Sequence, residues 1–156
     1  MPSKSIRPPG VASAPQSENV LSPADLRALA EFRALLRKFL YLNELAADQV
    51  GLTTQRFQAL LAIWAFREQQ ERDMAVGELS DALLIKDHST AELVTRLAGS
   101  GLILKAADKA DKRKTLLRLS PEGEKRMLEF ARIHLRQLGE QQKAFGDILR
   151  LLGDPA

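Results

Sequence analysis

The chain has 156 residues, a formal net charge of +3 and no cysteine. Its length suits one domain, and a hydrophobic content of 45% is enough for a packed core. The lack of cysteine excludes disulfide scaffolds, thiol catalysis and cysteine-based zinc sites. No apolar run approaches the roughly 20 residues of a membrane span, and the N-terminus lacks a signal-peptide core. We therefore expect a cytoplasmic protein.

Residues 1–21 contain four of the seven prolines and are predicted to form a flexible tail. Ser22, Pro23 and Asp25 then have the order of a helix start, with a capping hydroxyl, proline in the first turn and an acid near the positive helix end. The helical pattern continues to about Asp48. Its apolar face is wide, which indicates that the helix is buried against both its own chain and a partner.

The middle of the chain predicts shorter elements. A second helix starts at Thr53 or Thr54, and two short helices follow over 76–84 and 89–100. Gly101 comes where a helix C-terminus favours a positive φ. Residues 102–106 and 115–119 read as the strands of a β-hairpin whose connecting loop, 107–114, is rich in lysine.

Ser120-Pro121-Glu122 repeats the helix-start pattern, so a long helix is expected next, interrupted near Gly139 and followed by a last helix. The fold class is therefore mainly α, with a winged helix-turn-helix over 53–120. Helices over 22–52 and 121–156 are expected to form a dimerisation bundle.

Positive charge is concentrated in residues 86–126, which hold ten lysines and arginines against six acidic residues. The rest of the chain has 13 against 14. This local surplus favours an anionic partner, nucleic acid first, although charge alone fits a solvated surface equally well.

The second short helix is the candidate recognition helix, because such a helix fits the major groove and reads bases with its N-terminal residues. The alternative is that Ser89 and Thr90 only cap the helix. The hairpin tip could enter a minor groove, with Asp108 and Asp111 holding the loop in shape, or it could be a plain charged turn. The predicted DNA-binding residues are Lys86, His88, Ser89, Thr90, Thr95, Arg96, Lys109, Lys112, Arg113 and Lys114.

Catalytic and metal-binding motifs are not evident. The two histidines, His88 and His134, have no acidic neighbours at metal-ligand spacing, and His134 lies on an apolar helix face, as a core residue would. We find no nucleophile–base pattern and no phosphate-binding loop, so we expect neither an enzyme nor a bound cofactor or metal.

Several of these segments resemble the multiple antibiotic resistance regulator (MarR) family. The resemblance covers about residues 25–152 and is most specific in the wing, Asp108…Asp111-Lys112-Arg113, and in Leu119-Ser120-Pro121-Glu122-Gly123. It also includes His88-Ser89-Thr90, Val94-Thr95-Arg96-Leu97 and Gly101-Leu102-Ile103. The family's wing commonly has arginine where this chain has Lys112.

The resemblance implies a homodimeric bacterial or archaeal transcription factor, usually a repressor of a nearby operon that releases a pseudo-palindromic operator when a small molecule binds. It assigns Arg113 to the minor groove and Lys112 to a phosphate. For a small apolar or aromatic effector, the candidate pocket residues are Phe39, Tyr41, Phe57, Trp64 and His134. The candidate dimer interface consists of Leu26, Leu29, Phe145, Ile148, Leu149 and Leu152.

Two other classes of function remain open from the sequence. A winged helix can serve as a protein-interaction or structural dimer module that binds no DNA. An enzyme of unrecognised type is the other alternative, and it would have to depend on the two histidines.

Overall fold

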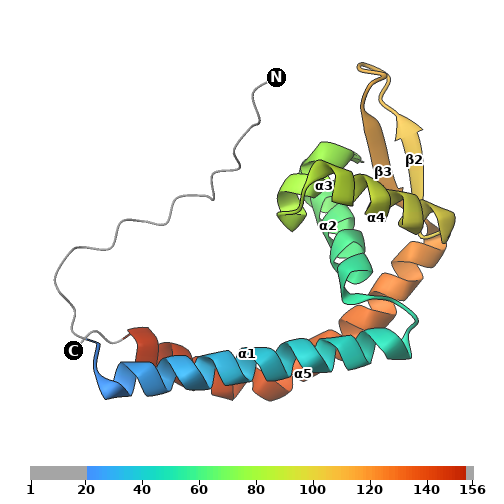
Figure 1. Ribbon diagram of the computed structural model, residues 1–156. Helices are drawn as coiled ribbons and strands as arrows, with labels where there is room; N and C mark the ends of the chain where they lie inside the picture. The colour runs from blue at the N-terminus through green and yellow to red at the C-terminus, as the bar shows by residue number, and fades with distance from the viewer. Residues whose placement is uncertain (1–20, 154–156) are drawn as a thin grey trace.

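The computed structural model describes residues 21–153, and the predicted tail over 1–21 lies outside this range except for Leu21. The described part is mainly helical with one small antiparallel sheet, and Figure 1 shows its arrangement. In chain order the elements are α1 (Pro23–Gln49), α2 (Thr54–Gln70), β1 (Met74–Ala75), α3 (Val76–Leu83), α4 (Asp87–Gly99), β2 (Ile103–Ala107), β3 (Thr115–Leu119) and α5 (Pro121–Gly153).

The two long helices lie side by side along the base of the molecule, with the helical lobe of α2, α3 and α4 at one end. The wing, which consists of β2, β3 and the loop between them, projects beyond α4 (Figure 1). The core lies where α2, α3, α4, the sheet and the first half of α5 meet. Its fully buried side chains include Leu60, Ile63, Leu79, Leu97 and Phe130.

The predicted start of α1 is confirmed. The Ser22 hydroxyl accepts a hydrogen bond from the Asp25 backbone N–H at 3.1 Å, and the Asp25 carboxylate accepts one from the Ser22 N–H at 2.8 Å. This reciprocal pair satisfies two backbone donors that a helix N-terminus leaves free. At the start of α2 the Thr53 hydroxyl accepts a single capping hydrogen bond, from the Arg56 N–H at 3.2 Å.

The helix-turn-helix unit differs from the prediction at one end. The helix α4 begins at Asp87, two residues before the predicted start, so Asp87 and His88 lie in its first turn. Neither Ser89 nor Thr90 is the N-cap, because that position belongs to Lys86. The predicted positive φ at Gly101 is confirmed at +71°.

The predicted hairpin is present, with Ile103 opposite Leu119 and Ala107 opposite Thr115. The sheet has a third strand that the sequence did not predict, because β1 pairs with β3 through Met74 and Leu117. This short strand fixes the wing to the chain segment that enters α3.

The prediction of two C-terminal helices is wrong, since α5 runs without interruption through Gly139. A glycine in a helix costs only about 1 kcal/mol relative to alanine, which packing on both sides of it can offset. On one side Phe130 is fully buried in the core, and on the other Phe145 packs against Phe39 of α1. Within residues 21–153, no helix has the length and apolar character needed to cross a membrane.

The start of α5 is fixed against the end of α4. The Ser120 hydroxyl donates to the Gly101 carbonyl at 2.6 Å and accepts from the Gly123 N–H at 3.0 Å, while the Ser120 N–H donates to the Leu102 carbonyl. Gly123 is buried so closely against Leu102 that a Cβ there would overlap the Leu102 carbonyl oxygen. Glycine at this position is therefore a packing requirement.

We expect Gly123→Ala to destabilise the fold by about 1–3 kcal/mol or more, because the obstacle is backbone that cannot rotate away. The matched control is Gly139→Ala in the same helix, where a Cβ meets nothing within 4 Å. That control should raise stability by about 0.5–1 kcal/mol. Urea unfolding of both variants checks this, and equal stabilities would contradict the assigned role of Gly123.

Candidate nucleic-acid interface

The helix α4 has one buried face and one open face. Thr90, Leu93, Val94 and Leu97 are buried against the lobe. At 3.6 residues per turn, His88, Glu92 and Thr95 fall on the opposite side, where all three are exposed. The open face therefore presents an imidazole, a carboxylate and a hydroxyl along one line.

A hollow lies on each side of this open face. The hollow toward α3 is lined by Lys86, His88 and Lys114 together with the acidic residues Glu78, Asp81, Asp87 and Asp108. The hollow between α4 and the wing is lined by Thr95, Lys105, Arg113 and Lys114, and it has no acidic lining residue. Positive charge is thus gathered on the wing side of α4.

Eight of the ten predicted DNA-binding residues are exposed around these surfaces, and Ser89 is half-buried. The prediction for Thr90 is wrong. Its side chain is fully buried, its hydroxyl accepts from Ser80 at 2.8 Å, and it donates to the Lys86 carbonyl at 3.2 Å. Thr90 joins α3 to α4 and cannot reach a DNA groove.

The wing-tip loop, residues 108–114, is held in shape by its own acids. The Asp108 carboxylate accepts from the Ala110 N–H at 2.8 Å. The Asp111 carboxylate accepts from the Arg113 N–H and from both Nε and Nη2 of its guanidinium, at 3.1 to 3.3 Å. These contacts lower the pKa of Asp111, the side-chain contact most. The Arg113 side chain is nevertheless 91% exposed and remains at the surface of the tip.

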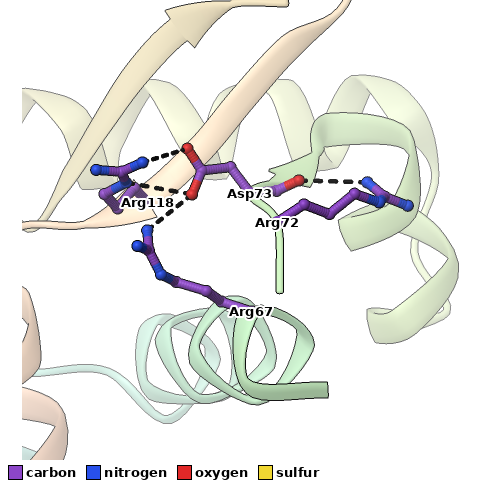
Figure 2. Close-up of polar contacts among 4 residues, drawn as sticks. All are labelled: Arg67, Arg72, Asp73 and Arg118. Atoms are coloured by element: carbon purple, nitrogen blue, oxygen red, sulfur yellow. Dashed lines mark hydrogen bonds and ion pairs between the residues drawn. The ribbon is translucent and has the colours of Figure 1, made fainter. Parts of the chain in front are cut away.

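One carboxylate connects the wing to the helical lobe. Asp73, just before β1, accepts from Arg67 of α2 at 2.8 Å and from Arg118 of β3 at 3.2 and 3.0 Å (Figure 2). The Asp73 side chain is only 18% exposed. Its carboxylate raises the pKa of Arg118, mainly through the hydrogen bonds. Asp73 therefore fixes the angle between β3 and α2.

A neighbouring ion pair supports the entry into α3. Arg72 donates to both oxygens of Glu78 at 3.0 and 2.5 Å and to the Asp73 carbonyl at 3.3 Å (Figure 2 shows the last contact). Glu78 also accepts from the Ala75 N–H at 2.8 Å. The hydrogen bonds from Arg72 are the main reason that the pKa of Glu78 is lowered. The Arg72 guanidinium lies 4.7 Å above the Phe66 ring.

Sequence reasoning missed Lys105, Asp73 and Arg118 as parts of this surface. Lys105 could have been found from strand alternation, since it is a cation on the hairpin next to the basic loop. Asp73 and Arg118 are 45 residues apart, and no local pattern links them.

The five predicted pocket residues do not form one group. Phe39 and Phe57 meet at His134, whose ring centroid lies 5.2 Å from that of Phe39 and 5.9 Å from those of Phe57 and Phe130. Tyr41 is 63% exposed, and Trp64 lines a different groove beside Arg67 and Glu68. Burial lowers the pKa of His134, which keeps its ring neutral at pH 7.

Within the chain, the six predicted dimer residues also divide. Leu26, Leu29 and Leu149 are exposed by 53%, 49% and 56%. Ile148 is buried, and Phe145 packs on Phe39. The side chain of Leu152 lies outside the described part. Within residues 21–153, no three His, Asp or Glu side chains are placed to hold a metal ion.

Helices α3 and α4 with the three-stranded sheet form a winged helix-turn-helix, carried on two long flanking helices. No protein-family model matches the chain. In sequence it is 31% identical over 100 residues to YsmB of Bacillus subtilis, an uncharacterised HTH-type transcriptional regulator. The match covers 64% of this chain and 65% of YsmB, so it spans slightly under two thirds of that relative.

In structure the chain is similar to AbsC, a MarR family transcriptional regulator from Streptomyces coelicolor, with a TM-score of 0.70 and 18% identity over 84% of this chain and 88% of AbsC. It is also similar to S. aureus MepR in a complex with DNA, with a TM-score of 0.59 and 17% identity over 78% of this chain and 95% of MepR. The chain therefore has the winged helix-turn-helix fold of the MarR family regulator AbsC. This fold agrees with the resemblance to the MarR family seen in the sequence.

Proposed function

We propose that this chain binds double-stranded DNA as a sequence-specific transcriptional regulator, with α4 in a major groove and the wing tip along the adjacent minor groove. The observation that carries the proposal is the charge arrangement beside α4. Lys105, Arg113 and Lys114 line a hollow without acids next to the open face of the helix. A duplex seated on α4 would bring its phosphates to these cations. The cytoplasmic location expected from the sequence follows from this role.

The wing gives the first test. Arg113→Ala should weaken binding to a random-sequence duplex and reduce the slope of log affinity against log salt by about 1, because one cation that offsets the negative charge of the minor groove is lost. Fluorescence anisotropy at several salt concentrations measures both quantities. Lys38→Ala, on the exposed surface of α1, is the control and should change neither.

If the wild-type protein binds no duplex even at low salt, the DNA-binding proposal is overturned. The chain would then be better explained as a winged-helix interaction module. If Arg113→Ala matches wild type while Lys38→Ala does not, the wing is not the contact.

We also propose that the protein is a homodimer through the outer faces of α1 and α5. Leucines on these helices have 41–66% of their surface exposed within one chain: Leu26, Leu29, Leu40, Leu45, Leu135, Leu138, Leu149 and Leu151. The helices α1 and α5 pack along each other and together present these apolar side chains. A self-complementary two-fold interface requires an apolar surface of this kind.

Leu149→Asp should convert the dimer to a monomer, because burying a carboxylate in an apolar interface costs several kcal/mol. Light scattering reports the mass. The matched control is Leu104→Asp in β2, since Leu104 is 55% exposed, like Leu149 at 56%, but lies in the wing. If both variants remain dimeric, the interface lies elsewhere.

We further propose repression that is relieved by a small aromatic effector at the junction of α1, α2 and α5. Four buried polar atoms find no hydrogen-bond partner among the described residues: Asn43 Oδ1, Thr54 Oγ1, His134 Nδ1 and Gln137 Oε1. By helix spacing, Asn43, Thr54 and His134 each lie within about one turn of Phe39, Phe57 or Phe130, and Gln137 lies about one turn beyond His134. Unpaired buried polar atoms beside aromatic rings suit a ligand that has a ring and a polar group.

Such a ligand releases DNA only if it binds the DNA-free state more tightly than the DNA-bound state. With benzoate and phenol as probes, we expect at least one to weaken DNA binding of wild type by about fivefold or more. His134→Phe keeps an aromatic ring but removes the polar atom, so the effect should shrink in that variant. If neither probe changes DNA affinity at any concentration, the effector proposal fails.

A further inference from the structure

Glu92 is the one acidic residue in the middle of the open face of α4. Counted around the helix, Glu92 is opposite the buried side chains Thr90 and Leu97. It lines neither of the hollows on the two sides of the helix. Its side chain is 68% exposed, so it is accessible to a duplex seated on α4.

A carboxylate at this point is unfavourable for affinity. DNA carries a dense negative charge, and an acid at the centre of the contact repels it without neutralising any phosphate. The only described partner of Glu92 is Arg96, one turn along the helix, at 3.5 Å. Both side chains are more than 60% exposed, and an ion pair of this kind holds a carboxylate only weakly. The Glu92 carboxylate is therefore free to meet a base edge.

The chemistry of the major groove decides which base that is. A carboxylate can only accept hydrogen bonds, and guanine and thymine present acceptors in this groove. Adenine has a donor beside an acceptor, whereas cytosine presents its N4 amino group as a donor. Cytosine is the base against which a carboxylate is least repelled and best bonded.

We propose that Glu92 is a specificity-determining residue that accepts a hydrogen bond from the N4 amino group of a cytosine at one fixed position in each operator half-site. This inference rests on the proposed DNA binding through α4. Affinity and specificity would then come from different residues. The wing attracts any duplex, and Glu92 disfavours half-sites that lack this cytosine.

The test is selection of binding sequences from a random duplex library with wild type, Glu92→Gln and Glu92→Ala. Wild type should prefer cytosine at one position per half-site by about tenfold over other bases. In Glu92→Gln the preference at that position should move to adenine, because a glutamine amide pairs with adenine N6 and N7. In Glu92→Ala it should fall below about twofold, while the other positions keep their preferences.

Glu68→Gln on α2 is the charge-matched control, because it removes the same negative charge from an exposed site outside both hollows beside α4. It should select the same sequences as wild type. The proposal is overturned if both Glu92 variants select the wild-type sequence at every position, or if they lose preference equally across the whole site. Binding by wild type that selects no sequence, or no binding at all, would instead overturn the proposed function.

Discussion

The position of the wing relative to α4 depends on the shared contact of Asp73 with two arginines. Arg67 comes from the end of α2 and Arg118 from β3, so one side chain joins the helical lobe to the sheet. The pairing of β1 with β3 adds backbone hydrogen bonds at the same place. Because β3 leads directly into α5 through Ser120, the strand that is fixed by Asp73 also connects the wing to the long helix.

The polar contacts of Asp73 fix the orientation of β3 relative to α2 better than an apolar contact could. Apolar packing is non-directional, whereas a carboxylate that accepts from a guanidinium Nε and Nη2 fixes both distance and angle. The side chain of Asp73 is mostly shielded while those of both arginines are about half exposed. Partial shielding strengthens the contact without the full desolvation cost of a buried pair.

The extent to which the sequence predicted the fold follows from the range of each interaction. Helix starts at Ser22 and Thr53 and the positive φ at Gly101 depend on residues within one or two turns, and these predictions are confirmed. Which residues of α4 are exposed was harder to predict. Thr90 has a polar side chain typical of the surface, but it is buried and hydrogen-bonded to Ser80, ten residues away. The strand β1 is only two residues long and forms because it pairs with β3. Its own sequence therefore contains no pattern from which the strand could be predicted.

The candidate site shows the same limit. The cations of the wing tip were predicted because they lie close together in the sequence, whereas Lys105 joins them only after the hairpin pairs. The roles of the acidic residues are harder still to predict, because the sequence shows only that each carries a negative charge. In the structure they divide by what they contact: Asp111 shapes the loop, Asp73 joins the wing to the lobe, and Glu92 has only an exposed arginine beside it. The first two are engaged with the protein itself, whereas Glu92 is held only by an exposed ion pair, and for this reason we propose a partner for it outside the chain.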